Sequence, residues 1–370
     1  MINKPITALI LLYLYFMIPK FDLFSIPGTV TGFRIQDIIS FILFLILFDY
    51  KLKKNALILV IIMFVHLIYS IIAWESYTSI LGFLRLIEYY FVAKGLAYVV
   101  DKGYWRNFVN FILLSIAFFS LGQYLSVFPN FDPARGIYYG VQFSGPFGTP
   151  AELTYFLIAI LYMSYYVDRI GIIKLASSTL VLFNGVKAGI LGFIVLFAQR
   201  IQNITSSVFF LFIILTLGTI YFLFDYVLIV AQFLQGILNG TASLTQMKGI
   251  YVDVTELSGV TEPSLRLRVE KWSIAISELS QNPLALLFGF GVYSYTFAMD
   301  GGVIKFLFEF GLIPFIYLMY ILFKTSITFI IMIISVSLLF DSYTSSVVMP
   351  VLMSTFIIMN KQLRIYKNAQ

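Results

Sequence analysis

The chain has no cysteine and a single histidine, His66, among its 370 residues. The lack of cysteine excludes a disulfide framework, a thiol nucleophile and thiolate metal ligands, and one histidine cannot form a histidine metal cluster. Charged residues are also scarce, at 11% of the chain against about 25% in an ordinary soluble domain. Because so little charge cannot cover a chain of this length, the composition excludes a water-soluble globule.

Hydrophobic residues make up 60% of the chain, and most of them stand in long uncharged runs. A helix needs about 20 such residues to cross the hydrocarbon layer of a bilayer. The sequence therefore predicts an all-α, polytopic integral membrane protein of about twelve transmembrane helices. We expect one transmembrane domain over 1–370, and a retained first helix rather than a signal peptide. The runs lie near 5–20, 35–50, 56–74, 78–100, 107–127, 150–167, 172–198, 204–224, 302–323, 326–341 and 343–360.

Basic residues predict the orientation of these helices. With a cytoplasmic amino terminus, Lys and Arg concentrate in the cytoplasmic loops, as the positive-inside rule requires. Both termini are then cytoplasmic, and the long segments 128–149 and 225–301 are external. The net charge of +6 is spread too thinly for a nucleic-acid partner. The residues on the predicted cytoplasmic side are Lys4, Lys51, Lys53, Lys54, Lys102, Arg106, Arg169, Lys174, Arg200, Lys324, Lys361, Arg364 and Lys367.

The run 172–198 has basic residues of the same predicted side at both of its ends. It must therefore enter and return within about 27 residues, whereas two full crossings need about 40. Residues 184–189 (Asn-Gly-Val-Lys-Ala-Gly) favour a break, so we expect two short or tilted arms. Lys187 then lies near the outer apex in a cavity lined by water or protein, because a lysine that faces lipid is costly. The alternative is one long helix, which would invert every later loop.

The external segment 225–301 contains an expected amphipathic helix. Thr261-Glu-Pro263 is typical of a helix start, and Asn282-Pro283 of a helix end. We expect this helix to lie at the membrane surface, with Arg266 and Arg268 on the two sides of its apolar stripe. The alternative is that both arginines contact only lipid headgroups. The stripe consists of Leu265, Val269, Trp272, Ile276 and Leu279.

Charged residues inside the apolar runs are candidates for function because a charge in a membrane is costly. Arg85 and Glu88 are three residues apart and Lys305 and Glu309 four apart, so each pair can meet on one helix face. A purely structural pair is the alternative in both cases. Asp300 stands where an external glycine-rich segment enters the next run, and plain helix capping is its alternative role. We expect His66 to be a packed, neutral core residue.

The predicted outer side carries several cations without matching carboxylates. They are Arg135, Lys187, Arg266, Arg268 and Lys271. Guanidinium groups bind phosphate oxygens in a bidentate manner and keep their proton, so a cluster of them in a membrane-embedded cavity favours a phosphate-bearing lipid.

Several short motifs in order resemble the O-antigen polymerase and O-antigen ligase superfamily. The likeness covers roughly 130–320 in pattern and the whole chain in hydropathy. Its elements are Arg268-x3-Trp272, Asn282-Pro283, Gly289-Phe-Gly291, Asp300-Gly-Gly, Glu309-Phe-Gly311, the earlier Arg135-Gly136 with Gly145-Pro146, and Val186-Lys187-Ala188-Gly189, where lysine replaces the arginine of the family element.

The resemblance implies a membrane glycosyltransferase with the GT-C type of helical fold. It would polymerise oligosaccharide repeat units carried on undecaprenyl diphosphate, both as donor and as acceptor, at the outer face of the bacterial inner membrane. The product would be O-antigen, capsular or exopolysaccharide. A chain-length regulator and a flippase of the same pathway are further implied partners, and no metal or other cofactor is expected. The ligase branch usually carries a histidine where Asp300 stands here.

The hypothesis for the reaction is an inverting displacement at the anomeric carbon. Arg268 is the principal expected catalytic cation, with Asp300 as the base and Glu309 as second choice. An O-antigen ligase and a transporter or lipid-linked sugar flippase remain as alternatives. The expected substrate-binding residues are Arg135, Lys187, Arg266, Trp272 and Arg85.

Overall fold

The computed structural model describes the chain in part. The described residues are 3–19, 22–25, 32–47, 54–75, 77–132, 136–138, 144–147, 149–167, 263–292, 301–323 and 345–368, with a few isolated positions between 177 and 337. The predicted runs 172–198, 204–224 and 326–341 therefore lie wholly or mostly outside them.

The described part is mostly helical, as the composition predicts. Where the structure describes an apolar run, a helix covers most of it. The helices of the amino-terminal part are α1 (Lys4–Met17), α2 (Ile35–Leu47), α3 (Lys54–Trp74), α4 (Thr78–Asp101), α5 (Trp105–Tyr124) and α6 (Pro150–Val167). Those of the carboxyl-terminal part are α10 (Pro263–Gln281), α11 (Pro283–Phe288), α12 (Gly302–Phe310), α13 (Leu312–Phe323) and α15 (Val348–Asn368).

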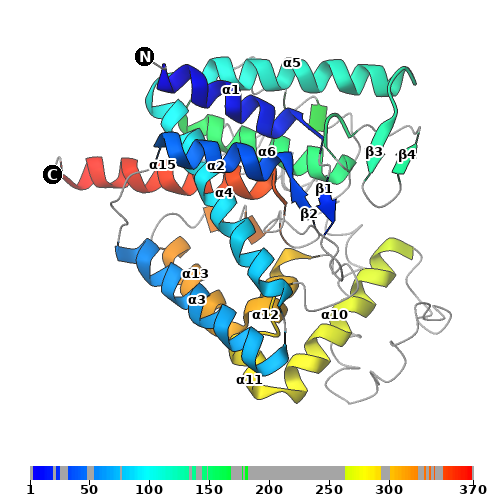
Figure 1. Cartoon of the computed structure of the whole chain (residues 1–370), viewed down its shortest axis with the longest axis vertical. Helices are drawn as coiled ribbons and strands as arrows, with labels where there is room; N and C mark the ends of the chain where they lie inside the picture. The colour runs from blue at the N-terminus through cyan, green and yellow to red at the C-terminus, as the bar shows by residue number, and fades with distance from the viewer. Residues whose placement is uncertain are drawn as a thin grey trace, which may run out of the picture.

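Two small antiparallel hairpins add to the expected all-α architecture. One pairs β1 (Asp22–Ser25) with β2 (Gly32–Arg34), and the other pairs β3 (Asn130–Asp132) with β4 (Gly136–Tyr138). Both fall in connections that the sequence places on the outer side. They lie at the same end of the helices (Figure 1).

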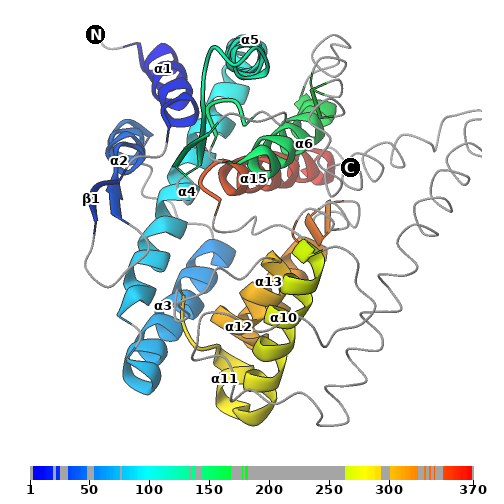
Figure 2. The same ribbon diagram turned by 90° about the vertical axis from the view of Figure 1, so that its right-hand side faces the viewer.

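The helices form two groups joined by α4. In the first group α1, α2, α5, α6 and α15 surround the upper part of α4 and share one large apolar core. In the second group α3, α10, α11, α12 and α13 pack together beside its lower part. Figure 2 shows the groups one above the other, with α4 running through both. One helix of 24 residues thus packs against segments that are far apart in the sequence.

The run 302–323 differs from the single pass that the sequence predicts. It forms two helices, α12 and α13, that meet at Gly311, whose φ is 79°. Its ψ is −179°, and this combination of a positive φ with an extended ψ ends an α-helix and is adopted by glycine without the steric cost of a Cβ. The predicted limits of α10 are confirmed more closely. It begins at Pro263 and ends at Gln281, before the Asn282-Pro283 turn.

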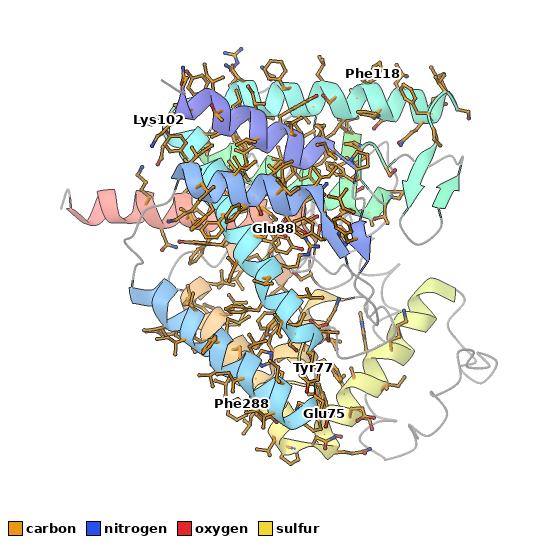
Figure 3. All side chains as sticks on the ribbon, viewed as in Figure 1. Glu75, Tyr77, Glu88, Lys102, Phe118 and Phe288 are labelled. Atoms are coloured by element: carbon orange, nitrogen blue, oxygen red, sulfur yellow. The ribbon has the colours of Figure 1, made fainter. Side chains whose placement is uncertain are left out.

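Two helices, α5 and α3, expose large apolar side chains while they bury polar ones. Every third or fourth residue on the outer face of α5 is a large exposed apolar side chain, and Figure 3 shows Phe118 pointing outward among them. The same helix buries Ser120 and Gln123. Helix α3 exposes a comparable stripe and buries His66 and Ser70. The exposed residues are Phe111, Leu114, Phe118 and Leu121 on α5, and Val60, Ile61, Phe64, Val65, Ile68 and Ile72 on α3.

By length and hydropathy, one described helix, Trp105–Tyr124, is able to cross a membrane unaided. Six further apolar stretches of 10–17 helical residues are shorter than that criterion, among them Lys4–Met17 and Pro150–Ser164. The prediction of about twelve crossings stays a prediction.

Candidate functional site

The expected site residues fall into three classes. Asp300, Arg135 and Lys187 lie outside the described residues. Arg266 and Arg268 lie in the first turns of α10, of which the structure describes the backbone but not these side chains. The remaining three, which are Trp272, Glu309 and Arg85, have described side chains. That the cations share one cavity stays a prediction.

Helices α10, α11 and α12 form a packed unit that contains several of the motifs. Ala275 and Leu279 of α10 contact Ala285 of α11 and Phe308 of α12 in one apolar cluster, which Phe290 completes. Trp74, at the end of α3, packs against this cluster, with its ring centroid 4.7 Å from that of Phe290. In Figure 1, α10 runs across the direction of α3 past this end.

The expected apolar stripe of α10 is confirmed in part. Trp272 and Leu279 are buried, and Ile276 is half-buried. Ile274, Ala275 and Ser277 are buried as well, so the covered face is wider than one stripe. The reason is that the second half of α10 packs against α11 and α12 of its own chain.

Two glycines allow the connection after α11 to cross the end of α12. Gly289 and Gly311 have φ values of 75° and 79°. A Cβ on Gly311 would lie 2.5 Å from the backbone N of Gly289 and from the carbonyl oxygen of Leu287, so no side chain fits. The backbone of the connection bonds to that of α12: Phe290 N donates to Phe308 O at 2.9 Å, and Gly291 N to Glu309 O at 3.0 Å.

The same connection is tied to α3 and α4. His66 of α3 is buried, and its Nδ1 lies 2.7 Å from the carbonyl oxygen of Phe288, so this nitrogen carries the proton and donates. Val292 lies against Gly82 of α4, where a Cβ would clash with it. Thr78 donates to the Val292 carbonyl at 3.2 Å. The expectation of a packed core histidine is confirmed.

Glu309 lies two residues before Gly311 and is buried. Its Oε1 is 4.0 Å from Nζ of Lys305, which confirms the pairing that the four-residue spacing predicts. A buried carboxylate beside a lysine has a structural role in neutralising that charge.

Arg85 confirms its predicted pairing and adds a partner that the sequence analysis missed. Its Nη1 lies 2.8 Å from Oε2 of Glu88 and also pairs with Asp37 at the start of α2. Its Nη2 donates to the carbonyl oxygen of Gly32 at 2.6 Å, and Tyr15 donates to Oε1 of Glu88 at 3.1 Å. These contacts occupy the guanidinium and favour the structural alternative over a substrate contact.

Two further buried polar groups were not foreseen. Gln123, in the last turn of α5, makes four hydrogen bonds to the backbone of the segment 129–145. Glu152, in the first turn of α6, accepts a hydrogen bond of 2.6 Å from Ser345 and thereby ties α6 to the segment before α15. The signal available in the sequence was the position of Gln123, a polar residue near the end of an apolar run. Its hydrogen-bond partners depend on the fold.

Among the described residues, no group of three or more His, Asp or Glu side chains is arranged to hold a metal ion. Comparison with known proteins assigns no relative: no family model matches the chain, and neither a curated protein nor a solved structure matches it.

Proposed function

We propose that the chain is a polytopic membrane glycosyltransferase that polymerises oligosaccharide units carried on a lipid diphosphate. The observation that carries the proposal is the packing of α10, α11 and α12 around one apolar cluster. The motifs that resemble the polymerase and ligase superfamily lie along this unit, from Arg268 and Trp272 through Asn282-Pro283 and Gly289 to Gly311. Sequence motifs that are each a weak signal alone thus lie together in one local structure.

Exposed apolar faces support the membrane part of the proposal. A soluble protein covers its outer faces with polar residues, whereas α3 and α5 expose large apolar stripes and bury polar side chains. Lipid is a solvent in which this arrangement is stable. Apolar side chains exposed to lipid carry no cost in free energy of hydration, and the buried polar groups find partners inside the protein.

Charge at one end of the first helix group supports the orientation. Lys4, Lys102, Arg106 and Lys361 are all exposed there, at the ends of α1, α4, α5 and within α15. Figure 1 places both termini at this end and both hairpins at the other, and Figure 3 labels Lys102 beside the termini. Residues from both extremes of the sequence thus form one basic side, which agrees with cytoplasmic termini.

In the proposed reaction an acceptor hydroxyl displaces the lipid diphosphate at the anomeric carbon, with inversion. The leaving group is a stable anion, so it needs fixed positive charge more than a proton donor. Arg268, with Arg266, Arg135 and Lys187, would supply that charge, and Asp300 would accept the proton of the hydroxyl. The pairing of Glu309 with Lys305 favours Asp300 as the base.

The test is the size distribution of carrier-linked glycan in cells that carry variants of the chain. Arg268→Ala and Asp300→Asn are expected to abolish chain extension, at least 100-fold, while the protein still accumulates in the membrane. The matched controls are Arg106→Ala and Asp101→Asn, which alter exposed groups at the opposite, basic end. Long polymer from both site variants would contradict the proposal.

The same assay separates the alternatives. In cells that lack the protein, single repeat units that accumulate on the outer side indicate a polymerase. Full-length polymer that stays on its carrier indicates a ligase. Precursor trapped on the inner side indicates a flippase.

A further inference from the structure

The side chain of Gln123 is nearly inaccessible to solvent, with 2% of its surface exposed. Its Nε2 donates to the carbonyl oxygen of Gly145 at 2.9 Å and to that of Pro129 at 3.3 Å. Its Oε1 accepts from the backbone N of Ser144 at 3.0 Å and from that of Gly145 at 2.8 Å. The amide therefore uses both of its protons and both lone pairs of its oxygen.

This bonding pattern is specific to glutamine. The amide pairs with both backbone groups of Gly145, as a neighbouring strand would, and binds two more residues in addition. A glutamate at this position has no N–H to donate and would set a carboxylate oxygen against two carbonyl oxygens. An asparagine is shorter by one methylene group.

The four bonds join the two ends of one segment. Pro129 directly precedes β3, and Ser144 and Gly145 follow β4, so the amide closes the chain around the hairpin. The hairpin itself pairs Asn130 with Tyr138 and Asp132 with Gly136.

Aromatic packing fixes the flanks of this segment. At its start, Phe128 lies over Gly122, where a Cβ would clash with its ring, and its ring centroid is 5.5 Å from that of Phe118. At its end, Phe147 is buried, and its ring centroid is 4.9 Å from that of Phe156 in α6. Gln123 thus joins a flank held by α5 to a flank held by α6.

We propose that Gln123 is a positioning residue that closes the segment 129–145 and holds the β3–β4 hairpin against the end of α5. The inference rests on the proposed function, because the connection between the two strands contains Arg135, one of the expected diphosphate contacts. Closing a segment of this length reduces its conformational entropy before the substrate arrives. Less entropy is then lost when Arg135 binds the diphosphate.

The first test reports on the clamp without any assay of activity. Arg135 is the sole Lys or Arg between Arg106 and Arg169, so external trypsin reports on this hairpin through one defined cut. In right-side-out vesicles we expect Gln123→Ala and Gln123→Glu to be cut after Arg135 about tenfold faster than the unaltered chain, because the bonds that close the segment are lost.

Gln36 is the matched control. It is also 2% exposed, and its Nε2 donates to the carbonyl oxygens of Ile18 and Pro19 beside the other hairpin. Gln36→Ala should leave the rate of the cut at Arg135 unchanged. The proposal would be overturned if the unaltered chain and both Gln123 variants were cut after Arg135 at the same rate. It would also be overturned if the Gln36 variant were cut faster than the unaltered chain.

The second test asks whether Gln123 acts through the hairpin. Polymerisation rates of Gln123→Ala, Arg135→Ala and the double variant form a cycle, and the double variant should be no slower than Arg135→Ala alone. If the fold-losses in rate of the two single variants multiply in the double variant, the positioning role is overturned. If the chain forms no polymer at all but trypsin cuts the Gln123 variants faster, the clamp stands and the proposed function falls.

Discussion

At the residue scale, three charged side chains, Arg85, Asp37 and Glu88, satisfy one another where α2 packs on α4. Arg85 is shared between Asp37 and Glu88, which come from different helices, and the backbone N of Arg34 donates to the other carboxylate oxygen of Asp37 at 2.7 Å. In Figure 3, Glu88 lies near the middle of α4, where the two helix groups adjoin. A buried network of this kind fixes the position of α2 against α4, because a loss of one partner leaves uncompensated charge.

Arg85→Met is therefore expected to cost about 3–5 kcal/mol, because it leaves the buried Glu88 and the partly buried Asp37 without their cation. The melting temperature of the detergent-solubilised protein should fall strongly, and the triple variant with Asp37→Asn and Glu88→Gln should recover much of it. Lys361→Ala, which breaks the exposed pair with Asp101, is the control, with an expected change of less than about 1 kcal/mol. A stable Arg85→Met variant that makes no polymer would instead identify Arg85 as a substrate contact.

At the scale of elements, the crossing of the 289–292 connection over α12 determines how the second helix group is assembled. The backbones approach too closely for side chains at Gly289 and Gly311, and the connection is bonded on one side to α12 and on the other to α3 and α4. The break between α12 and α13 belongs to the same arrangement, since Gly311, the positive-φ residue that ends α12, also provides the space for the crossing.

Gly311→Ala is expected to destabilise the protein by about 3 kcal/mol or more, because overpacking against backbone adds to the cost of a positive φ. Gly103→Ala is the control for a positive φ without crowding: its φ is 77°, but nothing lies within 4 Å of the added Cβ. It should cost about 1–2 kcal/mol, from the backbone conformation alone. Thermal unfolding of both purified variants in one detergent measures the difference. Equal losses would show that crowding at the crossing contributes nothing.

At the scale of the whole molecule, the arrangement of the first helix group agrees with a bilayer crossed in alternating directions. One end gathers exposed basic residues and both termini, and the other carries the two hairpins (Figure 1). The apolar stripe of α5 lies between these two ends, on a surface that no described element covers. Lipid contact along this stripe is what the proposed function requires.

The orientation can be tested in a chain that has no cysteine of its own. Val127, after α5, and Lys361, within α15, are both exposed, so single cysteines at these positions should react equally well in permeabilised cells. In intact cells, a membrane-impermeant thiol reagent should label the cysteine at 127 and leave the one at 361 unlabelled. Labelling at 361 alone would invert the orientation, and equal labelling would contradict a membrane barrier between the two positions.

Local signals in the sequence were sufficient for the helical class, the limits of α10 and the pairing of Arg85 with Glu88. Each depends on residues within a few turns of one another: uninterrupted apolar runs, a proline at a helix start, charges three residues apart. Hydropathy alone did not predict the break at Gly311, because a glycine within an apolar run is compatible with a continuous helix until another backbone must cross it.

The tertiary structure alone decided which distant groups meet. Asp37 reaches Arg85 across 48 positions of the chain, His66 reaches the carbonyl of Phe288 across 222, and Gln123 closes a segment whose far end is 22 residues away. No periodicity or spacing encodes such contacts, since they exist only after apolar surfaces have packed the helices side by side. The sequence by itself determined the helical class and where the described helices form, because these depend on composition and local pattern. Packing decided how buried polar groups are satisfied, because each must find its partner in whatever element the fold brings near.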